Sequence, residues 1–286
     1  MTRRPALLRP ALVLALVLAV TGCSTVKGMF KDEDKNEGLP VAELYDRAHA
    51  YMKGGRWSTA AETFGRLVAQ YPYGPYTEQA LMEQAYAHYK AGKHDDAVSS
   101  IDRFIRTYPT HKNIAYFYYL RGLANMSRNT VFLSRAFKLD TSSRDLQAPQ
   151  QAYNDFSIVA TRYPNSRYAA DARQRMVFLR NEFARFELNT GLYYLRRGAW
   201  VSAADRATYL LETYPQSSHQ NDAVALLGES YTRMGNETLA ADARRVLEKN
   251  DPQHPWLKGG WPKNPSVFQR LNPFAREGVP ERAKAE

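Results

Sequence analysis

Five prolines that each follow an apolar helical stretch constrain this chain more than any other feature. Proline lacks a backbone N–H and clashes inside a helix, so each of these prolines ends the helix before it. If each proline is numbered 32 in a 34-residue unit, position 20 is alanine every time. The prolines are Pro72, Pro109, Pro164, Pro215 and Pro252, and the alanines are Ala60, Ala97, Ala152, Ala203 and Ala240. The pattern indicates a series of helix-turn-helix units.

A second small residue, at position 8 of each unit, lies in the predicted first helix. These residues are Ala48, Ala85, Gly122, Gly191 and Gly228. Small residues at positions 8 and 20 let two antiparallel helices approach closely, and such a hairpin needs neighbours to bury its apolar faces. The pattern is that of the tetratricopeptide repeat (TPR). It predicts an all-α fold, a right-handed α-solenoid of about five TPR helix-turn-helix repeats over residues 40–252.

Two units are longer than the others. Gly122 lies too far before Ala152, so about 18 residues within 127–148 are predicted to be an insertion. The stretch Tyr168 to Arg197 has helix-forming composition and is predicted to be one long first helix. Between the first two units, in "YPYGPYTEQ", we expect a bend at Gly74 and Pro75 and a new helix starting near Thr77 or Glu78.

The first 22 residues are predicted to be a lipoprotein signal peptide. Three arginines precede an apolar run, Ala11 to Val20, that is too short to span a bilayer. The following Thr-Gly-Cys23 is typical of bacterial lipoproteins, in which the cysteine receives N-acyl and S-diacylglycerol lipid, palmitate for example. The position after the cysteine resembles that of Gram-negative lipoproteins sorted to the outer membrane, because a serine there, Ser24 in this chain, usually allows the transfer. The alternative to lipidation is that Cys23 is an ordinary buried cysteine. Residues 23–39 are polar and are predicted to be a flexible tether.

Composition and motifs favour a binding protein over an enzyme. Without the leader's arginines the formal net charge falls from +10 to +7, spread along the chain, and a secreted lipoprotein is not expected to bind nucleic acid. The six histidines show no metal-binding spacing, and the chain has no G-x-S-x-G elbow and no P-loop. We therefore expect no catalytic residues, no metal and no cofactor beyond the lipid on Cys23. An envelope hydrolase that uses the repeats as a platform is the alternative.

The first helices of the repeats are expected to line a groove that binds an extended peptide. Aromatic and methionine side chains occur at the groove-facing positions, with lysines at the edge. The alternative is that many of these rings pack between helices. The predicted groove residues are Tyr45, His49, Met52, Met82, Tyr86, Tyr89, Tyr116, Tyr119 and Met126.

Several segments resemble a known family more specifically than a generic TPR protein would. They are "YPYGPYTEQ", "AVSSIDRFIRTYPTHKNIAYFYYLRGL", "DTSSRD", "DFSIVATRYPNSRYAADA" and "RRGAWVSA". Over roughly residues 44–246 the chain resembles the BamD family, lipoproteins of the outer-membrane β-barrel assembly (Bam) machinery.

The resemblance implies a non-catalytic assembly factor, anchored by lipid in the inner leaflet of the outer membrane and facing the periplasm. It implies binding to the periplasmic domains of BamA, to other Bam lipoproteins and to the C-terminal signals of unfolded outer-membrane β-barrel proteins. For the BamA contact it points to Arg197, which precedes Gly-Ala-Trp. Alternatively, Arg197 only stabilises a helix C-terminus. A general periplasmic TPR lipoprotein of cell-wall or pilus assembly is the alternative function.

The C-terminal residues 253–286 do not match these segments. Their prolines exclude a long helix, and they are predicted to form a basic, proline-rich tail. Its aromatic residues either dock on the last repeat or form an arm that binds a partner.

Overall fold

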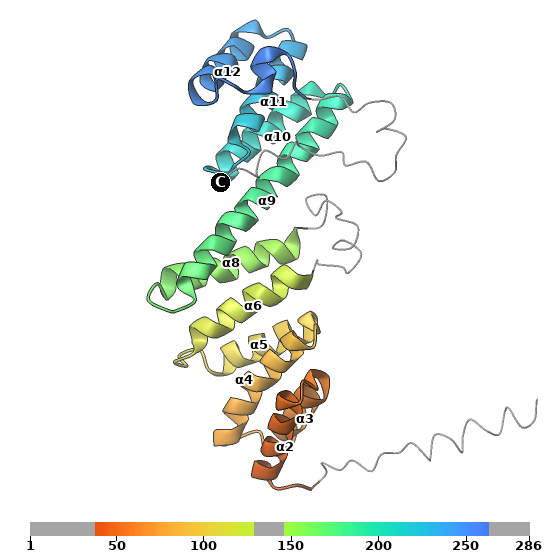
Figure 1. The fold of residues 1–286 in the computed structure, drawn as a ribbon, viewed down its shortest axis with the longest axis vertical. Helices are drawn as coiled ribbons and strands as arrows, with labels where there is room; N and C mark the ends of the chain where they lie inside the picture. Colours follow the sequence, from red (N-terminus) through yellow and green to blue (C-terminus); the bar gives the residue numbers. More distant parts are fainter. Residues whose placement is uncertain (1–37, 129–145, 263–286) are drawn as a thin grey trace, which may run out of the picture. The chain divides into compact units, whose positions relative to one another are not determined.

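The computed structural model describes residues 38–128 and 146–262, and within these ranges every regular element is a helix (Figure 1). Successive helices form antiparallel hairpins, which is the arrangement the repeats predict. The helices are α2 (Val41–Lys53), α3 (Trp57–Gln70), α4 (Pro75–Lys90), α5 (His94–Thr107), α6 (Ile114–Arg128), α8 (Gln147–Arg162), α9 (Ala169–Arg196), α10 (Trp200–Thr213), α11 (Gln220–Arg233), α12 (Glu237–Asn250) and the short 3₁₀ helix η2 (Pro255–Lys258).

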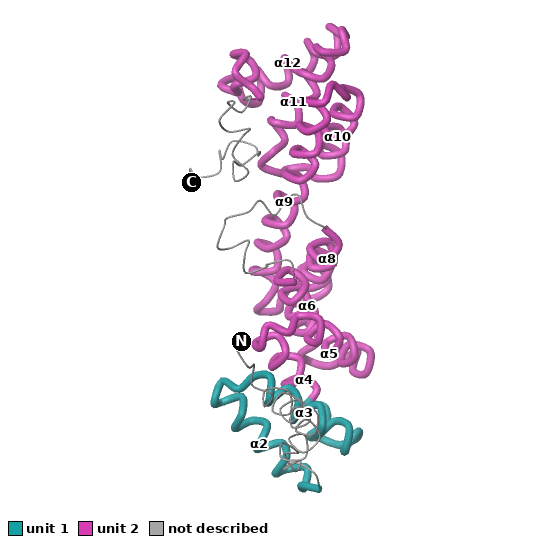
Figure 2. Tube along the Cα trace, turned by 90° about the vertical axis from the view of Figure 1, so that its right-hand side faces the viewer, with its two compact units in different colours: residues 1–80 teal, residues 81–286 magenta. Residues whose placement is uncertain are grey.

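The chain divides into two compact units within α4 (Figure 2). Unit 1 comprises Met1–Ala80 and unit 2 comprises Leu81–Glu286. In unit 1, the α2–α3 hairpin buries Leu44, Phe64 and Leu67 completely. The hydroxyl of Tyr71, the residue after α3, donates a hydrogen bond of 3.0 Å to the carbonyl of Leu39. This bond ties the start of the hairpin to its end.

All five second helices end in the same way. The residue before each repeat proline caps the helix, and its backbone N–H donates to the carbonyl four residues earlier. That earlier residue is buried every time, as Leu67, Phe104, Val159, Leu210 and Leu247. The common ending confirms the repeat register and the TPR fold class.

Three glycines at position 8 lie where the helices approach most closely. A Cβ atom on Gly122 would stand 2.7 Å from the ring of Phe156, and one on Gly191 would stand 2.5 Å from Leu226. Because real Cβ atoms do not approach so closely, these positions require the smallest residue.

The predicted long helix is present as α9, which runs for 28 residues from Ala169 to Arg196. The start of α4 differs from our expectation, because the helix begins at Pro75 rather than near Thr77 or Glu78. Proline is tolerated in the first turn of a helix, where its missing N–H has no intrahelical partner in any case. Thr77 lies inside this first turn, and its hydroxyl donates to the carbonyl of Tyr71.

The packed chain continues beyond residue 252. Trp256 and Trp261 are both only 6% exposed, and they join the apolar cluster of α9, α10, α11 and α12. The ring of Trp256 lies only 2.4 Å from the position that a Cβ on Gly228 would occupy. The first ten residues of the predicted tail therefore pack on the last repeat. The insertion expected within 127–148 falls largely on residues 129–145, which lie outside the described ranges, as do Phe268 and Phe274.

Candidate functional site

The structure brings together predicted groove residues of the second and third repeats in unit 2. Tyr116 on α6 interacts electrostatically with Tyr86 and Tyr89 on α4 and with Tyr168, which precedes α9. Burial is the main reason that the pKa of Tyr116 is raised above its usual value, and these neighbouring hydroxyls add to the shift. We call Tyr86, Tyr89, Tyr116, Tyr119 and Tyr168 the tyrosine cluster. All five are partly buried, so each ring packs against the protein and still reaches the surface.

The tyrosine cluster is held by contacts between α6 and the start of α9. The ring of Tyr168 stacks on that of Tyr119 at 5.0 Å and lies 5.5 Å from that of Tyr116. The Tyr119 hydroxyl donates to Asp171 Oδ2 at 2.6 Å, and Arg175 Nε donates to the same oxygen at 2.5 Å. The cluster therefore carries a carboxylate and a guanidinium at one edge.

The groups at this edge determine the pKa of the Asp171 carboxyl. Burial alone would raise the pKa of its carboxyl, but the bonds from Tyr119 and Arg175 outweigh burial and lower it. Arg175 also reaches another predicted groove residue, since its Nη1 lies 3.7 Å from the sulfur of Met126. Tyr168, Asp171 and Arg175 were not among the residues predicted from the sequence. Their spacing of three and four residues, which places them on one face of α9, was the available signal.

The remaining groove residues lie elsewhere. In unit 1, His49 Nε2 and the Tyr45 hydroxyl are hydrogen-bonded at 3.1 Å, and the ring of Tyr76 lies 5.2 Å from that of Tyr45. Met52 and, on α4, Met82 are partly buried. Tyr73 of the loop before α4 is 92% exposed.

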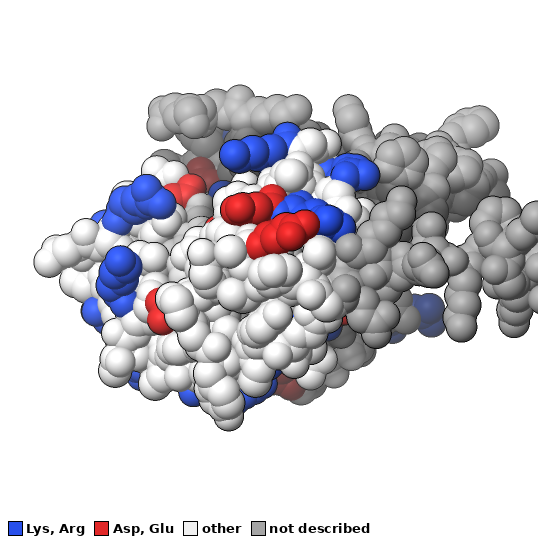
Figure 3. All heavy atoms as spheres, turned by 90° about the horizontal axis from the view of Figure 1, so that it is seen from below, with Lys and Arg blue, Asp and Glu red and all other residues white. Residues whose placement is uncertain are grey.

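Figure 3 shows one face of the molecule, with Lys and Arg in blue and Asp and Glu in red. Basic and acidic side chains are scattered there over a mainly uncharged surface. Among the residues that the structure describes, neither sign of charge is concentrated on this face.

Arg197 is exposed at the end of α9. Its backbone N–H caps the helix by donating to the carbonyls of Tyr193 and Tyr194, and Gly198 then turns the chain with φ of 76°. The guanidinium lies 5.2 Å from the centre of the Tyr193 ring. Tyr193, Trp200 and Val201 are themselves 45%, 37% and 63% exposed. Arg197 therefore combines a capping backbone with a side chain that lies on an exposed aromatic and apolar surface, which we call the Arg197 patch (Tyr193, Arg197, Trp200 and Val201).

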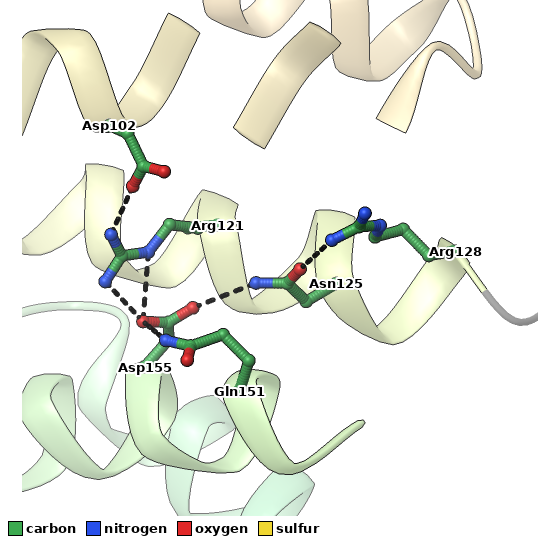
Figure 4. A network of polar contacts seen from close by, with 6 residues as sticks. All are labelled: Asp102, Arg121, Asn125, Arg128, Gln151 and Asp155. Atoms are coloured by element: carbon green, nitrogen blue, oxygen red, sulfur yellow. Dashed lines mark hydrogen bonds and ion pairs between the residues drawn. The ribbon is translucent and has the colours of Figure 1, made fainter. Parts of the chain in front are cut away.

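A polar network that was not expected from the sequence joins α5, α6 and α8 (Figure 4). Arg121 on α6 donates through Nη2 to Asp155 Oδ1 on α8 at 2.7 Å and pairs through Nη1 with Asp102 on α5. The Asp155 side chain is fully buried, and Asn125 and Gln151 each donate to it at 3.3 Å. Arg128 bonds to Asn125 and pairs with Asp95.

The network opens onto a hollow of about 520 Å³ that Asp102, Arg121, Asn125 and Arg128 help to line. Because opposite charges are paired and the buried carboxylate accepts several bonds, the arrangement suits fixing three helices in register better than proton transfer.

The described residues contain no group of three or more side chains that could hold a metal ion. In the same ranges no helix is both long and apolar enough to cross a membrane. Cys23 lies outside them, so its acylation remains a prediction.

Comparison with known proteins identifies the family. A family model described as "Outer membrane lipoprotein" (YfiO) matches residues 37–247. The outer membrane protein assembly factor BamD of Xylella fastidiosa (strain 9a5c) is 62% identical over 283 residues, which cover 97% of this chain and 95% of the relative. The chain belongs to the BamD family.

A more distant BamD relative, from Neisseria meningitidis (serogroup A), is 35% identical over 87% of this chain and 94% of its own length. Among solved structures, a thermophilic TPR protein of Thermus thermophilus aligns over 77% of this chain and 96% of its own, with 17% identity and a TM-score of 0.33. The fold assignment therefore rests on the helices of this chain and not on that likeness.

Two of the segments that carried the resemblance to BamD meet in the polar network. Asp102 and Arg121 belong to the segment that ends in "YYLRGL", and Asp155 opens "DFSIVATRYPNSRYAADA". Two of the segments typical of BamD thus supply the charged groups that join α5, α6 and α8.

Proposed function

We propose that this member of the BamD family is a non-catalytic, lipid-anchored scaffold of the Bam complex on the periplasmic face of the outer membrane. Membership of the family makes the chain an outer-membrane protein assembly factor. The observation that carries the proposal is 62% identity to a BamD protein over 97% of the chain. That match favours an assembly factor over a general TPR lipoprotein of cell-wall or pilus assembly.

The Arg197 patch is the proposed contact for the periplasmic domains of BamA. An exposed guanidinium beside exposed aromatic rings has the composition of binding hot spots, in which arginine, tyrosine and tryptophan predominate. Other Bam lipoproteins are proposed partners of the same assembly, and nucleic acid is not.

The tyrosine cluster is the proposed site for the C-terminal signal of unfolded β-barrel proteins. Its rings offer apolar surface to alternate side chains of an extended peptide. Further contacts are proposed from Tyr45, His49 and Met52 in unit 1 and from Met82 on α4.

Lipid on Cys23 is the proposed anchor, because the N-terminal pattern is that of a lipoprotein. Replacing Cys23 by serine is expected to move the protein from the membrane fraction to the soluble periplasm. Labelling with radioactive palmitate should be lost at the same time.

Affinity purification of the full chain from detergent-solubilised envelopes tests the scaffold role. BamA is expected to co-purify with the wild type, and Arg197→Glu is expected to reduce its yield at least tenfold. Arg245→Glu, a charge reversal at an exposed arginine of α12, serves as the control. Normal levels of β-barrel proteins after depletion of this chain would refute the assembly role, and an unchanged BamA yield with Arg197→Glu would remove this residue from the interface.

The peptide site is tested separately with the double variant Tyr86→Ala and Tyr119→Ala. Binding of a peptide from the C-terminus of a barrel protein is expected to weaken, because two aromatic contacts are lost. The unfolding temperature of the variant, measured alongside, shows whether the cluster lost its ligand contacts or its fold.

A further inference from the structure

A cavity of about 360 Å³ lies in unit 2, between α8, the middle of α9 and the turn that follows α10. It is separate from both the tyrosine cluster and the Arg197 patch, with which it shares no lining residue. Its volume falls within the range of sites that bind small ligands or single side chains of a partner. Neither the signal-peptide site nor the BamA contact proposed above makes use of it.

Aromatic rings form its walls. Phe183 is almost fully buried, and it lies between Tyr153 of α8 and Tyr214 of the repeat-ending Tyr-Pro pair. Its ring centre is 6.2 Å from that of Tyr153 and 5.8 Å from that of Tyr214. Three rings that fix one another by edge and tilted contacts give a preformed surface for an apolar group.

Arg180 is the charged group of this cavity. Its Nε is buried without a hydrogen-bond partner, and among the residues that the structure describes no carboxylate lies within ion-pair distance of its guanidinium. Other arginines on or beside α9 are paired: Arg175 with Asp171, Arg185 with Glu182 and Arg206 with Glu187. A buried N–H group without an acceptor is costly, and an arriving acceptor would remove that cost.

Amide and hydroxyl groups complete the lining. Gln150 and Asn154 lie on one face of α8, and Thr213 is the last residue of α10. Side-chain amides can both donate to and accept from the backbone of an extended peptide. The cavity therefore offers one cation, aromatic walls and neutral polar groups. A single guanidinium with aromatic walls suits a carboxylate attached to an apolar group better than a phosphate.

We propose that this cavity binds an acidic side chain of a partner protein, an Asp or Glu next to an aromatic residue, with Arg180 pairing with the carboxylate. The aromatic neighbour packs against Tyr153, Phe183 and Tyr214, and the amides of Gln150 and Asn154 hold the peptide backbone. The inference rests on the proposed role of this chain as a scaffold, and it assigns that scaffold a docking site distinct from the Arg197 patch.

The test measures binding of fluorescein-labelled peptides to the purified full mature chain by fluorescence anisotropy. The probe is a five-residue peptide, blocked at both ends, with Asp between two Phe residues. One matched peptide carries Asn in place of Asp. Another keeps Asn and has a free C-terminal carboxylate, which separates an acidic side chain from a chain terminus.

We expect the Asp peptide to bind the wild type at least tenfold more tightly than either matched peptide. Arg180→Gln is expected to abolish that preference. Arg173→Gln, at an exposed arginine of the same helix, is the matched control and should keep it. Because Arg180 makes no ion pair among the described residues, Arg180→Gln should melt like the wild type.

Three results would overturn the proposal. They are equal binding of the Asp and Asn peptides, preference for the free carboxylate, or an unchanged preference in Arg180→Gln. Absence of binding by the wild type at about 1 mM peptide would overturn it as well. None of these results depends on BamA, so the cavity can fail while the scaffold role stands. Loss of BamA from the wild-type purification would instead refute the scaffold role.

Discussion

Replacing Arg121 by methionine is expected to destabilise unit 2 strongly at neutral pH. The Asp155 carboxylate is fully buried, and Arg121 is its only cationic partner among the described residues. Methionine keeps most of the volume of the arginine stem but supplies no charge. Asp155 would then retain only the bonds from Asn125 and Gln151, each 3.3 Å long.

The magnitude follows from the burial of this pair. Removing one partner of a buried ion pair typically costs about 3–5 kcal/mol, because the other charge stays buried without compensation. For a chain of this size, each kcal/mol lowers the unfolding temperature by about 2–4 °C. Thermal unfolding followed by circular dichroism should therefore show a decrease of roughly 6–20 °C.

The loss is expected to depend on pH. Burial raises the pKa of Asp155 even in the wild type, although the hydrogen bonds and charge of Arg121 oppose the shift. Without Arg121 the folded-state pKa should rise further above that of the unfolded chain. The folded variant then binds a proton more readily than the unfolded one, so its stability deficit should be largest at pH 7.5 and should shrink as the pH falls toward the unfolded pKa.

Arg245→Met provides the control. Arg245 pairs with Asp242 on the surface of α12, where the two side chains are 73% and 47% exposed, and such pairs contribute less than about 1 kcal/mol. If Arg121→Met melts within 2 °C of this control, or if its deficit is the same at pH 5 and pH 7.5, the network does not stabilise the fold in the way described.

Three further predictions concern other parts of the chain. Gly228→Ala places a Cβ 2.4 Å from the ring of Trp256, so the free energy of unfolding should fall by about 1–3 kcal/mol in urea denaturation followed by tryptophan fluorescence. Burial would raise the pKa of Asp222, but hydrogen bonds from His219 and His254 lower it to about 2. The wild type should therefore lose stability as the pH falls from about 4 through 2, and Asp222→Asn should lose less stability over that range. Tyr119→Phe removes the hydroxyl bonded to Asp171, so the pKa of this carboxyl should rise when it is followed by NMR, and an unchanged pKa would show that Arg175 alone sets it.

The repeat architecture could be predicted because it depends on residue types with strong local effects. Proline ends a helix wherever it occurs in its interior, and the glycines at position 8 have a steric reason that the structure makes explicit. The start of α4 was misplaced for a related reason, since Pro75 was assigned to the bend although proline is acceptable in the first turn of a helix.

The candidate site could be predicted only in part. Tyr86, Tyr89, Tyr116 and Tyr119 were found because they occupy groove-facing positions of the first helices in successive repeats. Tyr168 and Asp171 escaped notice because the long helix and the insertion hide the repeat register in that region. The charged network was not predicted either, since its three charged residues lie on three helices and meet only after the helices pack. Asp155, a carboxylate next to Phe156 on the buried face of α8, was nevertheless visible as a charge on an apolar stripe.

The length of α9 has a consequence for how the molecule opens. At about 1.5 Å per residue the helix extends roughly 42 Å, and its side chains enter two separate apolar clusters. Leu179 and Phe183 pack in the cluster around Phe156, whereas Leu188 and Leu192 pack in the cluster around Leu226. In most repeat arrays each boundary is a turn at which local unfolding can stop. Here one uninterrupted helix, α9, joins the two apolar clusters, so we expect these clusters to unfold together in one cooperative step.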